Sequence, residues 1–142
     1  MPHAIQIRQT GGPEVLNWIS VDVGEPGSGQ VRLRQAAAGL NYIDVYHRTG
    51  YYPQPLPFIL GLEGAGTVEA VAQDVRGLKV GDRVAYAGPT GGYSEVRLIE
   101  ADRLVKLPKA ISFPLPLHTA TRCARSFRER VVRGGGFGKG AH

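Results

Sequence analysis

Short alternating segments separated by glycine and proline are the feature that most constrains the fold of this chain. Residues 29–37 (GQVRLRQAA) place Val31 and Leu33 on one side of an extended backbone, and Arg32 and Arg34 on the other. A period of two is typical of a strand with one buried face. The 142 residues include 20 glycines and 10 prolines. Such frequent turns favour a β-rich fold over a helix bundle.

One short helix interrupts the expected strands. Asn41 is an N-cap residue type, Asp44 follows three positions later as in a capping box, and Gly50 ends the segment, so a helix is expected over residues 41–48. The other strands are expected at residues 3–9, 15–23, 64–72, 82–87 and 93–99, with residues 102–108 completing the series. This order predicts a mainly β fold with a short helix, arranged as an antiparallel barrel or sandwich.

The net charge of +5 is confined to the C-terminal end of the sequence. Residues 1–113 hold 11 Lys/Arg and 11 Asp/Glu, whereas residues 114–142 hold 6 and 1. This distribution argues against nucleic-acid binding by the body of the protein. The single cysteine, Cys123, leaves no intrachain disulfide, and no apolar run has the length of a signal peptide or a membrane span. The cytoplasm is therefore the expected compartment.

Five motifs occur together in the order of a known family. They are GGPEVL (11–16), AAAGLNYIDVYHRTGYYP (36–53), LPFILGLEGAGTVEAVA (56–72), VGDRVAY (80–86) and GGYSEV (91–96). On these motifs residues 1–113 resemble the N-terminal GroES-like, alcohol dehydrogenase-like domain of the medium-chain dehydrogenase/reductase superfamily. Its zinc-free quinone oxidoreductases, the ζ-crystallin-like group, are the most similar. The resemblance implies a partly open β-barrel. In the complete family enzyme, a homodimer, a Rossmann domain binds NADPH and the active site lies between the two domains.

Two positions bear on metal chemistry. Zinc-dependent members of the superfamily carry a cysteine ligand where this chain has Asn41, and a histidine ligand where it has Leu62. Neither an amide nor an isobutyl group replaces thiolate or imidazole on Zn²⁺, and residues 88–95 lack the cysteines of the structural zinc lobe. No metal site is expected. The histidines show no ligand spacing and are expected at the surface: His3, His47, His118 and His142.

The resemblance also assigns site residues for a zinc-independent reduction. Asn41 and Tyr46 border the nicotinamide and the substrate, and Tyr52 closes the pocket. Asp44 and Glu63 maintain the structure and polarity of the site. A quinone suits such a site because its ring delocalises the incoming charge, so that neutral hydrogen-bond donors at its carbonyl oxygens are sufficient. Each assignment has a plainer alternative, with Asn41 as a simple N-cap, Tyr46 as a packing residue and Tyr52 as a loop anchor.

The last 29 residues depart from the family pattern. Residues 114–142 are basic and rich in glycine and arginine, and GGGFGKGA matches a dinucleotide fingerprint without the strand and helix that the fingerprint requires. We expect a disordered tail from a truncated or frameshifted reading frame that lacks the Rossmann domain, and hence no turnover by the chain alone. Three alternatives remain: an enoyl reductase-type enzyme, a non-enzymatic barrel whose basic tail binds nucleic acid, and a fragment without function.

Overall fold

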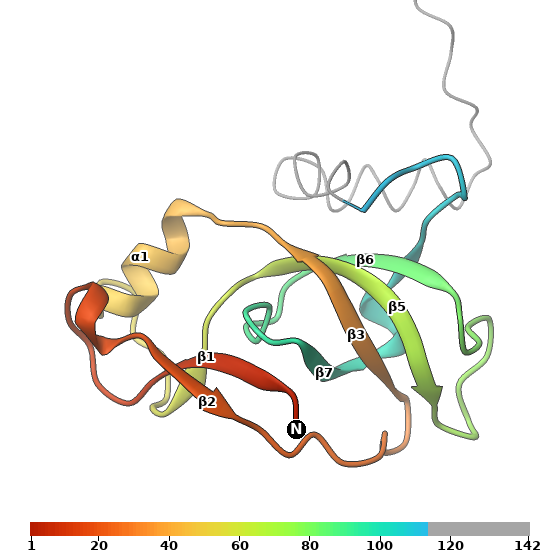
Figure 1. The fold of residues 1–142 in the computed structure, drawn as a ribbon, viewed down its shortest axis with the longest axis horizontal. Coiled ribbons are helices and arrows are strands. Elements are labelled where there is room, and N and C mark those ends of the chain that lie inside the picture. Colours follow the sequence, from red (N-terminus) through yellow and green to blue (C-terminus); the bar gives the residue numbers. More distant parts are fainter. Residues whose placement is uncertain (114–142) are drawn as a thin grey trace, which may run out of the picture.

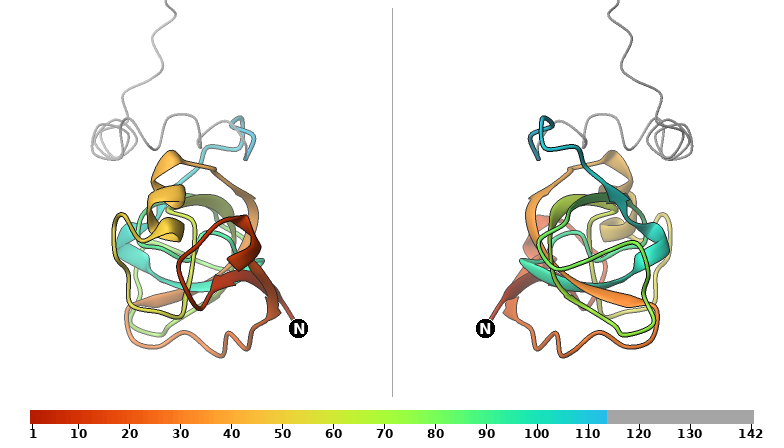
Figure 2. Two further views of the ribbon diagram at one scale, coloured as in Figure 1. Left: turned by 90° about the vertical axis from the view of Figure 1, so that its left-hand side faces the viewer. Right: turned by 90° about the vertical axis from the view of Figure 1, so that its right-hand side faces the viewer.

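The computed structural model describes residues 1–113, which form two antiparallel sheets and one α-helix (Figure 1). The expectations for residues 114–142, including the disordered tail, lie outside the described residues. The end views show the strands curving around a common interior without closing into a barrel, with α1 at one end (Figure 2). The predicted mainly β, partly open architecture is confirmed.

The larger sheet has five strands in the order β7-β3-β5-β6-β8. They are β3 (Gln30–Ala38), β5 (Glu63–Val71), β6 (Arg83–Ala87), β7 (Val96–Glu100) and β8 (Val105–Lys106). A 3-10 turn, η2 (Ala101–Arg103), joins the last two in sequence. The central pair, β3 and β5, runs from Val31 opposite Val71 to Ala38 opposite Gly64, with register shifts between Arg32 and Leu33 and between Gln35 and Ala37. This pairing brings the end of β3 next to the start of β5.

The smaller sheet has the order β2-β1-β4, with β1 (His3–Ile7), β2 (Asn17–Ser20) and β4 (Phe58–Ile59). The predicted strand over residues 15–23 was too long, because Pro13 to Val15 form a 3-10 turn, η1, in which the fixed φ of proline suits the first position. Strand β4 was not predicted, since it has only two residues and follows a proline-rich loop. The imidazole of His3 stacks on the indole of Trp18, with ring centroids 5.2 Å apart.

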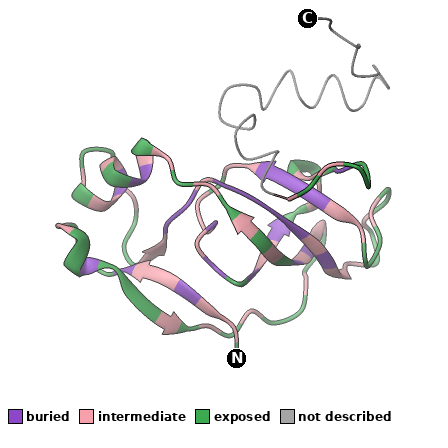
Figure 3. Ribbon diagram, turned by 45° about the horizontal axis from the view of Figure 1, so that its top comes forward, coloured by how far each residue is buried: buried purple, intermediate pink, exposed green. Residues whose placement is uncertain are grey.

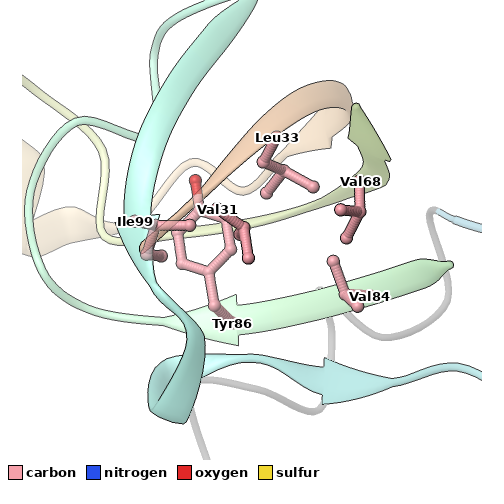
Figure 4. Packing of buried hydrophobic residues seen from close by; sticks show 6 residues of the cluster. All are labelled: Val31, Leu33, Val68, Val84, Tyr86 and Ile99. Atoms are coloured by element: carbon pink, nitrogen blue, oxygen red, sulfur yellow. The ribbon is translucent and has the colours of Figure 1, made fainter. Parts of the chain in front are cut away.

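A compact apolar cluster fills the interior of the larger sheet. Its members come from β3, β5, β6 and β7 and converge on one another in Figure 4: Val31, Leu33, Val68, Val84, Tyr86 and Ile99. Buried positions gather on β5 and β6, whereas β2 is mostly exposed (Figure 3). Complete burial of a side chain the size of Leu33 contributes about 1.5–3 kcal/mol. This cluster is the largest group of buried apolar side chains in the described region.

Helix α1 (Tyr42–Thr49) follows β3 directly. Asn41 is its N-cap, as predicted, and Gly50 ends it with a φ of +84° that favours glycine. Asp44 and His47, three positions apart on the inner face, are both buried. The expectation that His47 lies at the surface was therefore wrong: its ring packs edge-on against Phe58. No helix in the described part of the chain has the length and apolar character needed to cross a membrane.

Candidate active site

Asn41 links the end of β3 to the start of α1 and donates two hydrogen bonds to acidic side chains. Its backbone N–H donates to Asp44 Oδ2 over 2.9 Å, as part of the predicted capping box. Its side-chain Nδ2 donates to Glu63 Oε1 over 3.0 Å. The structure therefore brings together Asn41, Asp44 and Glu63, three of the five predicted site residues. The N-cap role and the site role of Asn41 are compatible.

Glu63 reaches Asn41 because of strand pairing. It is the first residue of β5 and is 3 % exposed. The pairing of Ala38 with Gly64 places Glu63 beside the segment that leaves β3. The carboxylate lies where a Cβ on Gly39 would be, 2.0 Å from Oε1. A larger residue at position 39 would displace this side chain.

Tyr93 belongs to the same polar network, although the sequence analysis did not select it. Its hydroxyl donates to Asp44 Oδ2 over 2.6 Å. Burial, then the hydrogen bond to Asp44 and the charges of Asp44 and Glu63, raises the pKa of Tyr93 well above the ordinary 10.0. The hydroxyl is therefore protonated at neutral pH. The only signal in the sequence was the position of Tyr93 within the GGYSEV motif.

Asp44 is an acceptor held inside the domain. It is 6 % exposed, and within residues 1–113 its Oδ1 is buried without a hydrogen-bond partner. Its Oδ2 accepts from both Asn41 and Tyr93. A buried carboxylate requires such donors, since burial without them costs several kcal/mol, on the order of the effective penalty for an ion. Asp44 thus joins α1 to the strand region that carries Tyr93.

Four tyrosines form a separate cluster on and after α1. The ring of Tyr46 lies 5.1 Å from the rings of Tyr42 and Tyr51 and 5.2 Å from that of Tyr52. The backbone N–H of Tyr52 donates to Tyr46 O over 3.2 Å, which ties the loop to the helix. Tyr42 and Tyr51 are more than 70 % exposed, at 72 % and 71 %. The two predicted tyrosines, Tyr46 and Tyr52, therefore lie together in an exposed aromatic surface.

A second buried network supports the loop that precedes Tyr93. The Tyr86 hydroxyl donates to Gln35 Oε1 over 2.7 Å, and Arg97 Nη1 donates to the Tyr86 hydroxyl over 3.2 Å. Arg97 Nη2 also donates to Thr90 O over 2.9 Å. Burial raises the pKa of Tyr86, and the charge of Arg97 opposes this rise. The network fixes the turn between β6 and Tyr93.

The donor set at Asn41 does not fit zinc. An amide stands at position 41 and an isobutyl group at Leu62, and neither group is a zinc ligand in proteins. In the part of the chain that the structure describes, no three His, Cys, Asp or Glu side chains group in a way that could hold a metal ion. Neutral groups of Asn41 and Tyr93 donate hydrogen bonds to the two buried acids.

Comparison with known proteins identifies the family. The alcohol dehydrogenase GroES-like domain matches residues 27–109, more than half of the chain. The chain belongs to this family. Six of the described strands and α1 lie entirely within the matched residues of the GroES-like domain, together with every predicted site residue.

The curated relatives of this GroES-like domain include reductases. A quinone oxidoreductase of Pseudomonas aeruginosa is 53% identical over 115 residues, which cover 80% of this chain and 35% of that protein. A 2-haloacrylate reductase of a Burkholderia species is 45% identical over 115 residues, 77% of this chain and 34% of that protein. The chain thus spans about a third of the length of these relatives. The predicted homology to quinone oxidoreductases is confirmed.

A solved structure gives the same result. The Escherichia coli quinone oxidoreductase, crystallised as a complex with NADPH, superposes with a TM-score of 0.80 at 38% identity. The match covers 89% of this chain and 41% of that one. Relatives of this GroES-like domain therefore include an enzyme with NADPH bound.

Proposed function

We propose that this GroES-like domain binds a quinone for NADPH-dependent, zinc-independent reduction. The observation that carries the proposal is the placement of Asn41. Its amide is held by Glu63 at the N-terminus of the helix that carries Tyr42 and Tyr46. A fixed polar group at the start of a helix whose tyrosines form an exposed aromatic surface suits a flat ligand with carbonyl oxygens.

Asn41 has the hydrogen-bonding capacity that the proposal requires. A carboxamide has two N–H donors and a carbonyl acceptor, and the bond to Glu63 uses one donor. Because the carboxamide is planar, the bond from one N–H to Glu63 also fixes the direction of the second N–H before a ligand binds. A placed donor at an oxygen that gains negative charge contributes about 10²–10³ in rate. A quinone spreads that charge over its ring, which becomes aromatic on reduction.

The tyrosine cluster supplies the apolar part of the site. Tyr46 and Tyr52 meet edge to face, with ring centroids 5.2 Å apart. Aromatic rings favour stacked and edge contacts with other flat rings, worth about 0.5–1.5 kcal/mol beyond the buried area. We propose that these two rings contact the quinone and the nicotinamide, and that Asn41 contacts a carbonyl oxygen.

The chemistry of these residues also fits the nicotinamide end of NADPH. When bound, NADPH supplies the hydride. The groups of this chain that face it under the proposal, the Asn41 amide and the Tyr46 and Tyr52 rings, are neutral. The buried acids Asp44 and Glu63 lie behind Asn41, so the site favours an uncharged or cationic ring over a phosphate.

Reduction of an activated double bond is a second candidate. The 2-haloacrylate reductase among the relatives favours it. An amide donor at a conjugated carbonyl or carboxylate would polarise the adjacent double bond, just as it would polarise a quinone through its carbonyl oxygen. The two candidates differ in the ligand that the site prefers, and competition between an enone and a quinone separates them.

The test is ligand binding by the 142-residue chain. Equilibrium dialysis with duroquinone, whose fully substituted ring does not alkylate Cys123, should show binding that Asn41→Ala weakens about threefold to tenfold, the effect of one neutral hydrogen bond. Asn17→Ala is the matched control, because Asn17 is an exposed asparagine of β2. A parallel assay follows NADPH oxidation with and without duroquinone.

Two results would contradict the proposal. One is the absence of duroquinone binding to the wild-type chain. The other is an equal loss of binding in Asn41→Ala and Asn17→Ala. If 2-cyclohexenone displaces bound duroquinone at a lower concentration than unlabelled duroquinone does, the site prefers the enone, which would instead favour the double-bond reductase.

A further inference from the structure

We propose that Tyr93 is a positioning residue for Asn41. The inference rests on the proposed role of Asn41 at the quinone and adds a residue that the family resemblance did not assign. Tyr93 does not contact the ligand in this proposal. Its hydroxyl acts through Asp44, which in turn fixes the start of α1 and the direction of the Asn41 amide.

A single carboxylate oxygen connects the two residues. Asp44 Oδ2 accepts from the Tyr93 hydroxyl over 2.6 Å and from the Asn41 backbone N–H over 2.9 Å. Because Asp44 Oδ1 is buried without a partner in the described region, these two donors are the ones that hold the carboxylate. Without the hydrogen bond from Tyr93, the Asp44 carboxylate would be free to rotate toward another hydrogen-bond donor. The first turn of α1, and Asn41 with it, would then change orientation.

Tyr93 is itself held from both sides. Its backbone N–H donates to Leu60 O, and its carbonyl oxygen accepts from the Ile5 N–H, each over 2.8 Å. Its ring lies against Gly61, where φ is +91° and an added Cβ would be only 2.5 Å from Tyr93 Cδ1. The glycine of the GLEGAG motif therefore makes room for the tyrosine of GGYSEV. The hydroxyl has little freedom to leave Asp44.

The protonation state of Tyr93 decides between two roles. Burial, with the hydrogen bond and charge of Asp44 and the charge of Glu63, holds its pKa above the ordinary range. The hydroxyl therefore keeps its proton and is a poor proton source for a reduced quinone. It is suited to donate a constant hydrogen bond. The geometry, with the hydroxyl proton directed at Asp44 Oδ2 over 2.6 Å, favours a positioning role over general-acid catalysis.

The experiment compares Tyr93→Phe with wild type in the 142-residue chain by ¹⁵N NMR. The reporter is the pair of Asn41 Nδ2 proton signals, assigned by their loss in Asn41→Asp. In wild type, the signal of the Nδ2 proton that is hydrogen-bonded to the Glu63 carboxylate should lie downfield of the signal of the other Nδ2 proton. In Tyr93→Phe, we expect it to move upfield, toward the position of an exposed asparagine, and duroquinone affinity to fall severalfold.

Tyr86→Phe is the matched control. It also removes one hydroxyl from a tyrosine of the same domain, but the Tyr86 hydroxyl donates to Gln35 and accepts from Arg97 rather than contacting Asp44, and Tyr86 is buried where Tyr93 is half-buried. Thermal unfolding should show comparable destabilisation in both variants, while only Tyr93→Phe moves the Asn41 signals. Unchanged Asn41 signals in Tyr93→Phe, or equal movement in both variants, would overturn the proposal.

A second variant covers the case in which Tyr93→Phe does not fold. Asp44→Asn keeps the shape of the side chain and weakens both hydrogen bonds, so the Asn41 signals should move in the same direction, and their constancy would overturn the inference. The NMR result does not depend on quinone binding. If the signals move but the wild-type chain does not bind duroquinone, the positioning role stands and the proposed function fails.

Discussion

The two ends of the β3–β5 pair have different interiors. At one end Val31 faces Val71 and Leu33 faces Val68, within the apolar cluster. At the other end the pair reaches Ala38 and Gly64, next to the polar network of the candidate active site. The same two strands therefore serve packing at one end and hydrogen bonding at the other.

The change from one interior to the other coincides with an irregularity in the register. A first shift, between Arg32 and Leu33, lies within the apolar end, and a second, between Gln35 and Ala37, lies where the interior changes. Such shifts redirect side chains and are frequent beside functional sites. Beyond this point Asn41, Asp44 and Glu63 are polar and are held by hydrogen bonds. The apolar end stabilises the domain. At the polar end, the buried side chains lose hydration, but their hydrogen bonds fix the directions of their polar groups.

Leu33→Ala should give the largest effect on stability. Leu33 is completely buried, and truncation of such a leucine costs about 2–5 kcal/mol through lost burial and a residual cavity. The free energy of unfolding, measured in urea, checks this value. A loss below about 0.5 kcal/mol, typical of exposed positions, would show that the apolar end does not carry the stability and would remove the contrast between the two ends.

Asn41→Ala should destabilise less than Leu33→Ala. Asn41 is half-buried and lies at the N-terminus of α1. Replacement of such an N-cap residue by alanine costs about 0.5–2 kcal/mol in the free energy of unfolding. The same variant should lose duroquinone affinity, which would separate function from stability at the polar end. Urea unfolding at neutral pH is the measurement. A cost equal to that of Leu33→Ala would mean that the polar end is also a stability centre.

Asp82→Asn should give the smallest effect, remote from the candidate active site. Asp82 contacts Lys106 over 2.8 Å and Lys79 over 3.2 Å. Burial raises its pKa, but the hydrogen bonds from the side chains of Lys106 and Lys79 and the backbone of Lys79, with the charge of Lys106, outweigh this and lower the pKa below 3.8. A lowered folded-state pKa stabilises above the unfolded value, and the contribution is lost as pH falls through the folded value.

The Asp82 variant should therefore cost roughly 0.5–1 kcal/mol at neutral pH, as expected for ion pairs near the surface. Below pH 3.8 the difference between Asp82→Asn and wild type should shrink. Urea unfolding at several pH values measures it. A difference that grows on acidification would contradict the assigned direction of the pKa shift.

Local patterns account for the parts of the structure that the sequence could predict. The alternation around Val31 and Leu33 predicts β3, and the spacing of Asn41 and Asp44 predicts the start of α1, because both depend on residues close in the chain. The burial of His47 was missed, since its place on the inner face of α1 depends on what the helix packs against.

Tyr93 was missed for a related reason. It lies 49 positions from Asp44, and their contact depends on how the two sheets meet, where Ala4 bridges to Ser94 and Ile5 N–H donates to Tyr93 O. Sequence spacing does not reveal such a contact. Glu63 and Asn41 are also remote in sequence, but the family resemblance supplied both.

The stacked pair of His3 and Trp18 has a practical consequence for spectroscopy. Trp18 is the single tryptophan of the chain and belongs to the smaller sheet, where His3 covers its ring. Its emission would therefore report the integrity of the β1–β2 hairpin, because separation of the two strands would remove the stacked imidazole. The tyrosine cluster requires a different optical signal, namely energy transfer from its phenols to this one acceptor.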